Sequence, residues 1–208
     1  MLLPDTLRYS PLMLRGGFGT YAGFLDDSGL QRILDEAKLN RRVAVESKVL
    51  NQDNEEVRGG NPPRCFLSAP GGVIQDSFFR SPWMLQTLQS ITGVSVRPSG
   101  DRGTYTYYTR AKDFLSLHRD IETCDMAVIT CLANNRPQAR SGSLRVYPGK
   151  FEDRLSEIKA SCGAGSSLIQ LMAGQTLVLL GGLLPHEVLP VDYGQERIVS
   201  VLCYELLA

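Results

Sequence analysis

Residues 104–120 read TYTYYTRAKDFLSLHRD and contain the pattern that decides the fold. Two runs rich in β-branched and aromatic residues, 104–109 and 114–118, are typical of short strands. The second run ends at His118, and Asp120 follows two residues later. Because alternate residues of an extended chain point to the same side, this spacing presents an imidazole and a carboxylate together.

The same strand pattern continues to the end of the chain. Further strands are expected at residues 126–132, 143–147, 168–171, 176–180, 187–191 and 197–204. Only residues 151–160 interrupt them with helical spacing, which is too little helix for a parallel α/β sheet. About eight short strands therefore predict a mainly β fold, an antiparallel double-sheet roll with helices packed outside it.

The first hundred residues have a different character. Ser28 is a plausible N-cap for helical spacing over residues 30–37, and residues 81–88 open a second helix with Ser-Pro. Between these helices, residues 51–77 contain Gly-Gly and Pro-Pro turns, so we expect them to be largely irregular or to carry short strands.

The composition fits one globular unit. The 208 residues are 43% hydrophobic, enough for one substantial core. We therefore expect a single domain, 1–208, with helical support and loops in 1–103 and the roll in 104–208. Acidic and basic side chains number 22 each, so the net charge gives no reason to expect a nucleic acid or an acidic membrane as partner.

Cysteine usage and hydropathy indicate the compartment. Five cysteines without a C-x-x-C pair favour reduced thiols in a cytoplasmic protein. The first fifteen residues lack the continuous apolar stretch of a signal peptide. Residues 160–186 carry no Asp, Glu, Lys or Arg, but glycines divide them into pieces of strand length, so we do not expect a membrane helix.

The chain has two histidines, and a roll could bring His186 beside His118 and Asp120. Two neutral imidazoles and one carboxylate on one face of a metal are typical of non-haem iron(II) oxygenases. A catalytic zinc site accepts the same ligands, so these three residues alone leave both metals open. Histidines with a purely structural role are the third alternative.

Arg197 lies on the next predicted strand after His186. If its side chain points into the roll, the buried guanidinium needs a planar anionic partner, which the carboxylate of a cosubstrate would supply. The alternative is a structural ion pair with one of three acids. These are Glu187, Asp192 and Glu205.

Three stretches carry a family resemblance. They are Tyr108-x9-His118-x-Asp120, Ser141-Gly142-Ser143-Leu144-Arg145-Val146-Tyr147-Pro148-Gly149, and Pro185-His186-Glu187-Val188-Leu189-Pro190-Val191 followed by Arg197. In order and spacing they resemble the prolyl hydroxylase-like branch of the 2-oxoglutarate/Fe(II)-dependent dioxygenase superfamily. The similarity covers roughly residues 93–205.

This resemblance implies a cupin-like double-stranded β-helix, or jelly roll, that binds Fe(II) through His118, Asp120 and His186. It further implies that 2-oxoglutarate chelates the iron and reacts with O2, while Arg197 receives its distal carboxylate and Tyr108 reaches the cosubstrate. Relatives that transfer halide have a small residue in place of the acid. The presence of Asp120 therefore favours hydroxylation, desaturation or ring formation.

The chain also departs from the family pattern. The spacing from His186 to Arg197 is a residue or two longer than usual, which puts the register of Arg197 in question. Leu132 stands where relatives often place a second tyrosine against the cosubstrate. Thr130 is a candidate replacement, on a face that the sequence does not settle.

Arg110, Arg145 and Tyr147 are candidates to line the substrate side, although the strand face that Ser143, Arg145 and Tyr147 share is more typical of a solvated one. The sequence thus predicts a cytoplasmic dioxygenase that hydroxylates or otherwise oxidises a small molecule or an amino-acid or peptidyl group. Two alternatives remain. They are a zinc-dependent hydrolase or lyase with the same ligands, and a non-catalytic jelly-roll sensor.

Overall fold

The fold is built on one sheet that curls over on itself. A computed structural model describes residues 5–51, 58–100, 102–136 and 140–207, which contain a 12-stranded sheet. Its later strands are β5 (Thr104–Tyr108), β6 (Phe114–His118), β7 (Met126–Asn134), β8 (Leu144–Val146), β9 (Ser167–Ile169), β10 (Thr176–Leu179), β11 (His186–Val188) and β12 (Arg197–Leu207). All eight strands expected in this part of the chain are confirmed, with ends that differ by three residues at most.

The first hundred residues also contribute to the sheet. Their strands are β1 (Phe18–Tyr21), β2 (Val45–Val49), β3 (Arg64–Pro70) and β4 (Ser95–Pro98). We expected helical support and loops in this part, with short strands only within residues 51–77, of which 52–57 lie outside the described residues. β1, β2 and β4 are four or five residues long, too short for alternation to stand out.

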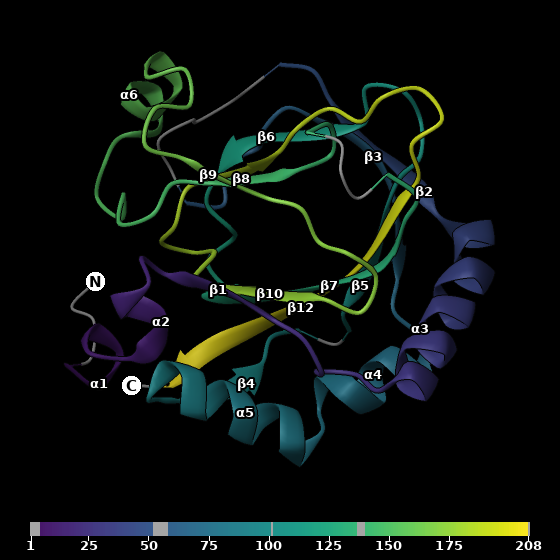
Figure 1. The fold of residues 1–208 in the computed structure, drawn as a ribbon, viewed down its shortest axis with the longest axis horizontal. Coiled ribbons are helices and arrows are strands. Elements are labelled where there is room, and N and C mark those ends of the chain that lie inside the picture. Colours follow the sequence, from purple (N-terminus) through teal and green to yellow (C-terminus); the bar gives the residue numbers. More distant parts are fainter. Residues whose placement is uncertain (1–4, 52–57, 101, 137–139, 208) are drawn as a thin grey trace.

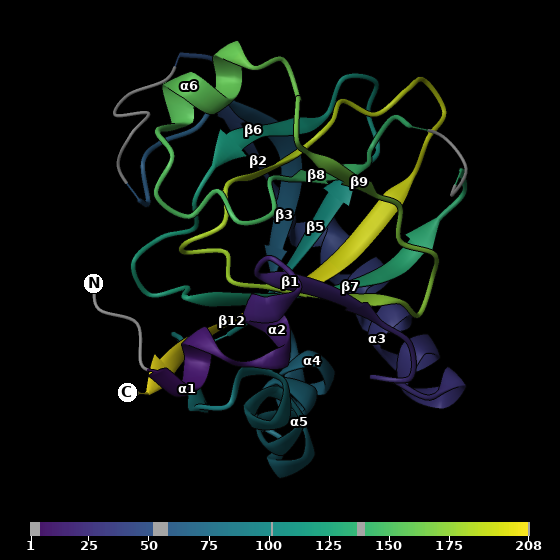
Figure 2. The ribbon, with the colours of Figure 1, turned by 60° about the vertical axis from the view of Figure 1, so that its left-hand side comes forward.

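Two facing layers result from the strand order β1-β10-β7-β12-β5-β3-β6-β11-β8-β9, shown in Figure 1. β3 joins the layers because it pairs with β5 in one and with β6 in the other, as Figure 2 shows. Off this path, β2 pairs with β3 and β4 with β12. This antiparallel arrangement is a double-stranded β-helix, as predicted.

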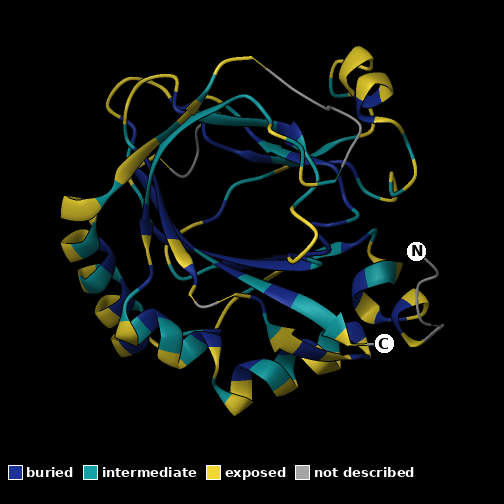
Figure 3. Cartoon of the chain, turned by 180° about the vertical axis from the view of Figure 1, so that it is seen from behind, coloured by how far each residue is buried: buried dark blue, intermediate teal, exposed yellow. Residues whose placement is uncertain are grey.

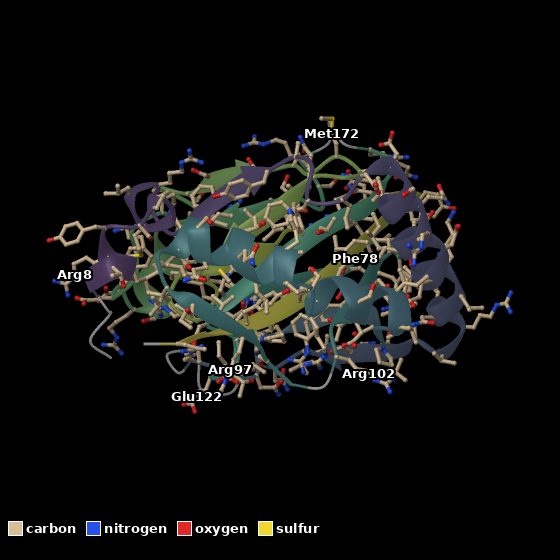
Figure 4. The ribbon with its side chains drawn as sticks, turned by 90° about the horizontal axis from the view of Figure 1, so that it is seen from below. Arg8, Phe78, Arg97, Arg102, Glu122 and Met172 are labelled. Atoms are coloured by element: carbon tan, nitrogen blue, oxygen red, sulfur yellow. A yellow bond between two sulfur atoms is a disulfide. The ribbon has the colours of Figure 1, made fainter. Side chains whose placement is uncertain are left out.

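Helices cover the outer face of the layer that contains β7 and β12 (Figure 4). These are α1 (Asp5–Arg8), α2 (Pro11–Leu14), α3 (Asp27–Asn40), α4 (Val73–Phe79) and α5 (Pro82–Thr92), with a 3-10 turn at Arg41–Val43. The short α6 (Leu155–Ala160) packs instead against β6 in the facing layer. The predicted helices correspond to α3, α5 and α6. Ser81 caps α5 as expected, whereas Asp26 rather than Ser28 caps α3 by accepting a hydrogen bond from the backbone N–H of Gly29.

The side chains of β7 point alternately toward the helices and toward the interior of the roll. Met126 and Val128 pack against Phe79 of α4 and Leu88 of α5. Ala127, one position along, faces the space between the two layers. β7 and β10 are consequently buried on both faces over most of their length, while the outer sides of the helices are exposed (Figure 3).

A disulfide joins Cys124 to Cys203, with the Cα atoms 4.9 Å apart. The prediction of five reduced thiols is therefore wrong. Sequence spacing does not show that the loop after β6 lies beside the end of β12. The expected cytoplasmic location loses the support it drew from unpaired cysteines, because disulfides are rare in reducing compartments.

The uncharged stretch 160–186 contains the short strands β9 and β10. In the described part of the chain, no helix has the length and apolar character needed to cross a bilayer.

The disulfide should contribute measurably to stability, since it closes a loop between residues 79 positions apart. Cys203→Ala is expected to lower the free energy of unfolding by about 2–4 kcal/mol. Urea unfolding with and without a reducing agent checks this. The wild type in reductant should match the variant, and a variant as stable as the oxidised wild type would show that the crosslink contributes nothing.

Candidate metal centre

Pairing between β6 and β11 places the two histidines side by side. His118 ends β6, His186 begins β11, and the two are partners in the antiparallel register. Their ring centroids lie 4.3 Å apart. Strand pairing thus brings together two imidazoles that are far apart in sequence, and the register shifts directly after them, between His186 and Val188.

Asp120 completes a cluster with these histidines. Its backbone N–H donates to the carbonyl oxygen of Gly181, which turns the carboxylate toward the imidazoles. Oδ1 of Asp120 lies 3.4 Å from Nε2 of His118 and 3.6 Å from Nε2 of His186. All three candidate ligand atoms are within 4.8 Å of one another. The structure therefore brings the three predicted metal ligands to one point.

Both imidazoles present the same nitrogen to that point. Nδ1 of His118 lies 2.8 Å from the carbonyl oxygen of Ser116, and Nδ1 of His186 lies 2.8 Å from that of Leu184. A carbonyl only accepts, so each Nδ1 carries the proton and donates. Each Nε2 then keeps a lone pair for a metal, an arrangement common among metal-binding histidines.

The charges in the cluster suit a cation. Burial alone would raise the pKa of Asp120, but the imidazoles of His186 and His118 and the Arg58 guanidinium outweigh it and lower that pKa. Burial, together with the neighbouring His118, lowers the pKa of His186 to about 4. At neutral pH Asp120 is therefore ionised and His186 is uncharged, as metal ligands must be.

Gly181 allows the acid to approach closely. A β-carbon added at Gly181 would overlap Oδ2 of Asp120. Only glycine leaves room for the carboxylate in this position. Gly181 is one of the glycines that divide the uncharged stretch 160–186, and its role is to admit the side chain of Asp120.

Arg119, between two candidate ligands, points away from them and links their segment to the chain that leads into β11. Its Nε donates to the carbonyl oxygen of Leu183 over 2.8 Å, three residues before His186. Its Nη2 donates to the carbonyl oxygens of Lys150, Phe151 and Asp153. The guanidinium thus ties both ligand-bearing segments to one loop.

Arg58 binds the turn that carries Asp120 from the side opposite Arg119. Its Nε donates to the carbonyl oxygen of Asp120, and its Nη2 forms a 2.8 Å ion pair with Asp125. Nη2 also donates to the carbonyl oxygens of Ile121 and Glu122. The turn that carries Asp120 is therefore braced from both ends.

Arg197 is buried in the same cavity, with only 2% of its surface exposed. Nη1 has no hydrogen-bond partner among the described residues, and Cζ lies 5.4 Å from the centroid of the Tyr108 ring. Two of the three acids considered as structural partners bind other arginines, Glu187 to Arg145 and Glu205 to Arg97. A buried guanidinium with a free donor is a strong site for an anion.

The cavity has a volume of about 210 Å³ and runs between the two layers. Its closed end contains Arg197 and Tyr108, each at most 3% exposed. Thr104, which is exposed, lies toward the mouth. The wall is otherwise mainly apolar, formed by Phe66, Leu115, Ala127, Ile129, Leu144, Val188, Val199 and Val201.

The predicted substrate-side residues lie outside this cavity. Arg145 and Tyr147 line a separate surface pocket beside α6, where Arg145 pairs with Glu187. Arg110 pairs with Glu46 and Asp113. On β8, Leu144 faces the cavity, so the residue that follows it points outward.

Leu132 and Thr130 also face away from the cavity. Leu132 packs against Ile33 of α3, and Thr130 forms a hydroxyl hydrogen bond with Thr176. From β7, Ala127 and Ile129 line the cavity, and Ile129 is level with Val201 of β12. Sequence reasoning also missed Arg119 and Arg58, because backbone carbonyl partners leave no pattern in the sequence.

Arg119→Ala is expected to weaken cobalt(II) binding about tenfold or more, because the ligand segments lose their common brace. Calorimetric titration of the folded variant measures this. Arg119→Lys should fall between the variant and the wild type, since one ammonium cannot reach all four carbonyls. The matched control is Arg97→Ala, which removes an exposed arginine on β4. Equal affinity in Arg119→Ala and Arg97→Ala would refute the role of the brace.

Comparison with known proteins finds likeness in structure but not in sequence. No protein-family model and no curated protein matches the chain. The solved structure of the non-heme alpha ketoglutarate dependent epimerase SnoN from nogalamycin biosynthesis superposes with a TM-score of 0.70 at 12% identity, over 97% of this chain and 82% of that one.

Two further structures show the same likeness. A Pseudomonas putida prolyl-4-hydroxylase matches with a TM-score of 0.63 at 17% identity, over 95% of this chain and 96% of that one. HygX from Streptomyces hygroscopicus, solved with nickel and 2-oxoglutarate bound, matches with a TM-score of 0.66 at 14% identity, over 98% of this chain and 87% of that one. The resemblance predicted from the motifs is confirmed at the level of the fold, the double-stranded β-helix of these enzymes.

Proposed function

We propose that this chain is an Fe(II)- and 2-oxoglutarate-dependent dioxygenase that oxidises an unactivated C–H bond, with hydroxylation as the expected outcome. The observation that carries the proposal is the unpartnered Nη1 of Arg197 in the cavity that also contains the His-Asp-His cluster. A metal cluster alone suits several enzyme classes. A buried cation at the closed end of the same cavity suits a chelating cosubstrate with a second, distal carboxylate.

His118, Asp120 and His186 would hold the iron. Adjacent ligands about 2.1 Å from an octahedral ion lie about 3 Å apart, so the separations of 3.4 and 3.6 Å need only a small inward movement. Two imidazoles and one carboxylate leave three positions for cosubstrate and O2. SnoN has been solved with Fe3+ and alpha ketoglutarate, which supports the same pairing here.

Arg197 and Tyr108 would receive the distal carboxylate of 2-oxoglutarate. The guanidinium supplies the positive charge, and its free Nη1 supplies a donor. The Tyr108 phenol stays protonated because burial raises its pKa, so its hydroxyl is available to donate as well. Apolar neighbours such as Val188 and Val199 exclude water from the ion pair and strengthen it.

Iron and 2-oxoglutarate, when bound, supply the two-electron reduction that lets one oxygen atom of O2 enter the substrate C–H bond while the other enters succinate and CO2 leaves. The chain's own residues would bind and orient the cosubstrate and the substrate and exclude water from the cavity. Structural neighbours include an epimerase, a carbocyclase and a prolyl-4-hydroxylase, so the fold accommodates several outcomes. One added oxygen atom in the product mass identifies hydroxylation.

The zinc hydrolase or lyase is less well supported because it gives Arg197 no anionic partner. The non-catalytic sensor leaves unexplained why both Nε2 atoms face Asp120. Conversion of 2-oxoglutarate to succinate in air with iron(II), and none with zinc, separates these alternatives. We infer a small molecule or an amino-acid or peptidyl group as substrate.

Replacing any one of His118, Asp120 and His186 with alanine should reduce succinate formation by at least about 100-fold, because the iron loses a ligand. Succinate is measured by mass spectrometry, and circular dichroism verifies folding. Asp192→Ala, which removes an exposed acid outside the cavity, is the control and should retain activity. A folded triad variant with wild-type turnover would overturn the assignment.

Arg197→Ala should raise the KM for 2-oxoglutarate about 10–100-fold, since a charged hydrogen bond contributes about 1.5–3 kcal/mol. Arg197→Lys keeps the charge but loses the planar fork, so its KM should be intermediate. Steady-state kinetics at varied 2-oxoglutarate measures both. An unchanged KM in Arg197→Ala would mean that another residue binds the cosubstrate.

A further inference from the structure

Besides the phenol of Tyr108, three aliphatic hydroxyl side chains line the cavity wall formed by β3 and β5. Ser68 and Thr106 are direct partners in the register of these neighbouring strands, which lie side by side in Figure 2. Thr104 lies two positions before Thr106 on β5, and all three residues face the interior of the roll. The remainder of this wall is apolar.

The hydroxyls of Ser68 and Thr106 have no partner. Cross-strand Ser and Thr pairs often bond to each other, but no hydrogen bond involves either hydroxyl among the described residues. Thr106 is 7% exposed. Ser68 is half-buried, and both hydroxyls are open to the space of the cavity, where the polar group of a ligand can bond to them.

Their position separates them from the cosubstrate end. Tyr108 is level with Arg197 in the register of β5 and β12, and Thr106 is level with Val199. At about 3.3 Å per residue, Thr106 lies roughly 6.6 Å nearer the mouth than Tyr108, and Thr104 roughly 13 Å nearer. A molecule entering from the mouth therefore meets Ser68 and Thr106 before it reaches Arg197.

This part of the cavity carries no charge of its own. Among the described lining residues, the ionised groups are Asp120 and Arg197, which the metal and the cosubstrate would neutralise. An ammonium or carboxylate on the substrate would enter without a counter-ion, which is unfavourable in an apolar pocket. The lining instead suits an apolar group that carries a hydroxyl, carbonyl or amide.

We propose that Ser68 and Thr106 form a subsite for an uncharged, hydrogen-bonding group of the substrate, whose apolar part packs against Phe66, Leu115 and Val201. This rests on the proposed function and narrows it. The portion of the substrate that reaches the metal is neutral, which disfavours a free zwitterionic amino acid and favours a neutral hydroxylated or amide-bearing molecule.

The test measures binding of matched small probes to the full chain saturated with nickel(II) and 2-oxoglutarate. Cyclohexanol, cyclohexylamine and cyclohexanecarboxylate share one apolar skeleton and differ in charge. Ligand-observed NMR should show cyclohexanol binding at least about tenfold more tightly than either charged probe. Saturation with 2-oxoglutarate keeps the carboxylate probe away from Arg197.

The double variant Ser68→Ala, Thr106→Val should lose about five- to tenfold of its affinity for cyclohexanol while retaining its affinity for 2-oxoglutarate within about twofold. Thr20→Val, an exposed threonine on β1, is the control and should behave as the wild type.

Three results would overturn the subsite. They are no binding of cyclohexanol, equal or tighter binding of a charged probe, and unchanged cyclohexanol affinity in the double variant. A large loss of 2-oxoglutarate affinity in that variant would also overturn it, because the hydroxyls would then serve the cosubstrate. Failure of the proposed function shows itself separately, as a wild-type chain that does not bind 2-oxoglutarate at all.

Discussion

The antiparallel pairing of His118 with His186 is the constraint on which the rest of the site depends. Backbone hydrogen bonds between β6 and β11 set the distance between the imidazoles, and the carbonyls of Ser116 and Leu184 set which nitrogen each presents. Asp120 reaches the same point because the backbone beyond β6 is anchored on Gly181. The ligand geometry is thus largely present before any ion binds, which lowers the entropy lost on binding.

The second constraint is electrostatic and lies at the closed end of the cavity. Arg197 is buried with an unused donor, and two of the three acids considered as its partners, Glu187 and Glu205, are paired with other arginines. An isolated buried charge is costly, so the buried position of Arg197 is explained best by an anionic ligand that binds beside it. The His-Asp-His cluster and Arg197 face one cavity of about 210 Å³, an arrangement that supports the proposed binding of a metal and a chelating anion side by side.

Much of this was accessible from sequence because it depends on local patterns. Alternating β-branched and aromatic residues predicted the later strands, and the H-x-D spacing followed by a second histidine predicted the three residues that the structure brings to one point. The rest depends on tertiary contacts that leave no local signal. Cys124 meets Cys203 only once the sheet has curled, and Arg119 and Arg58 bind backbone carbonyls. Arg145 points outward because of the register of β8, and a shift of one residue would have turned it into the cavity. The sequence did not determine that register.

We propose that the His-Asp-His cluster and Arg197 act together on one ligand. Anaerobic calorimetry comparing 2-oxoglutarate with glutarate distinguishes joint from separate action, since glutarate retains both carboxylates and lacks only the keto oxygen. We expect one tight site for 2-oxoglutarate when iron(II) is present, much weaker binding of glutarate, and loss of that difference without metal. Equal binding of the two acids in the presence of iron(II) would contradict it.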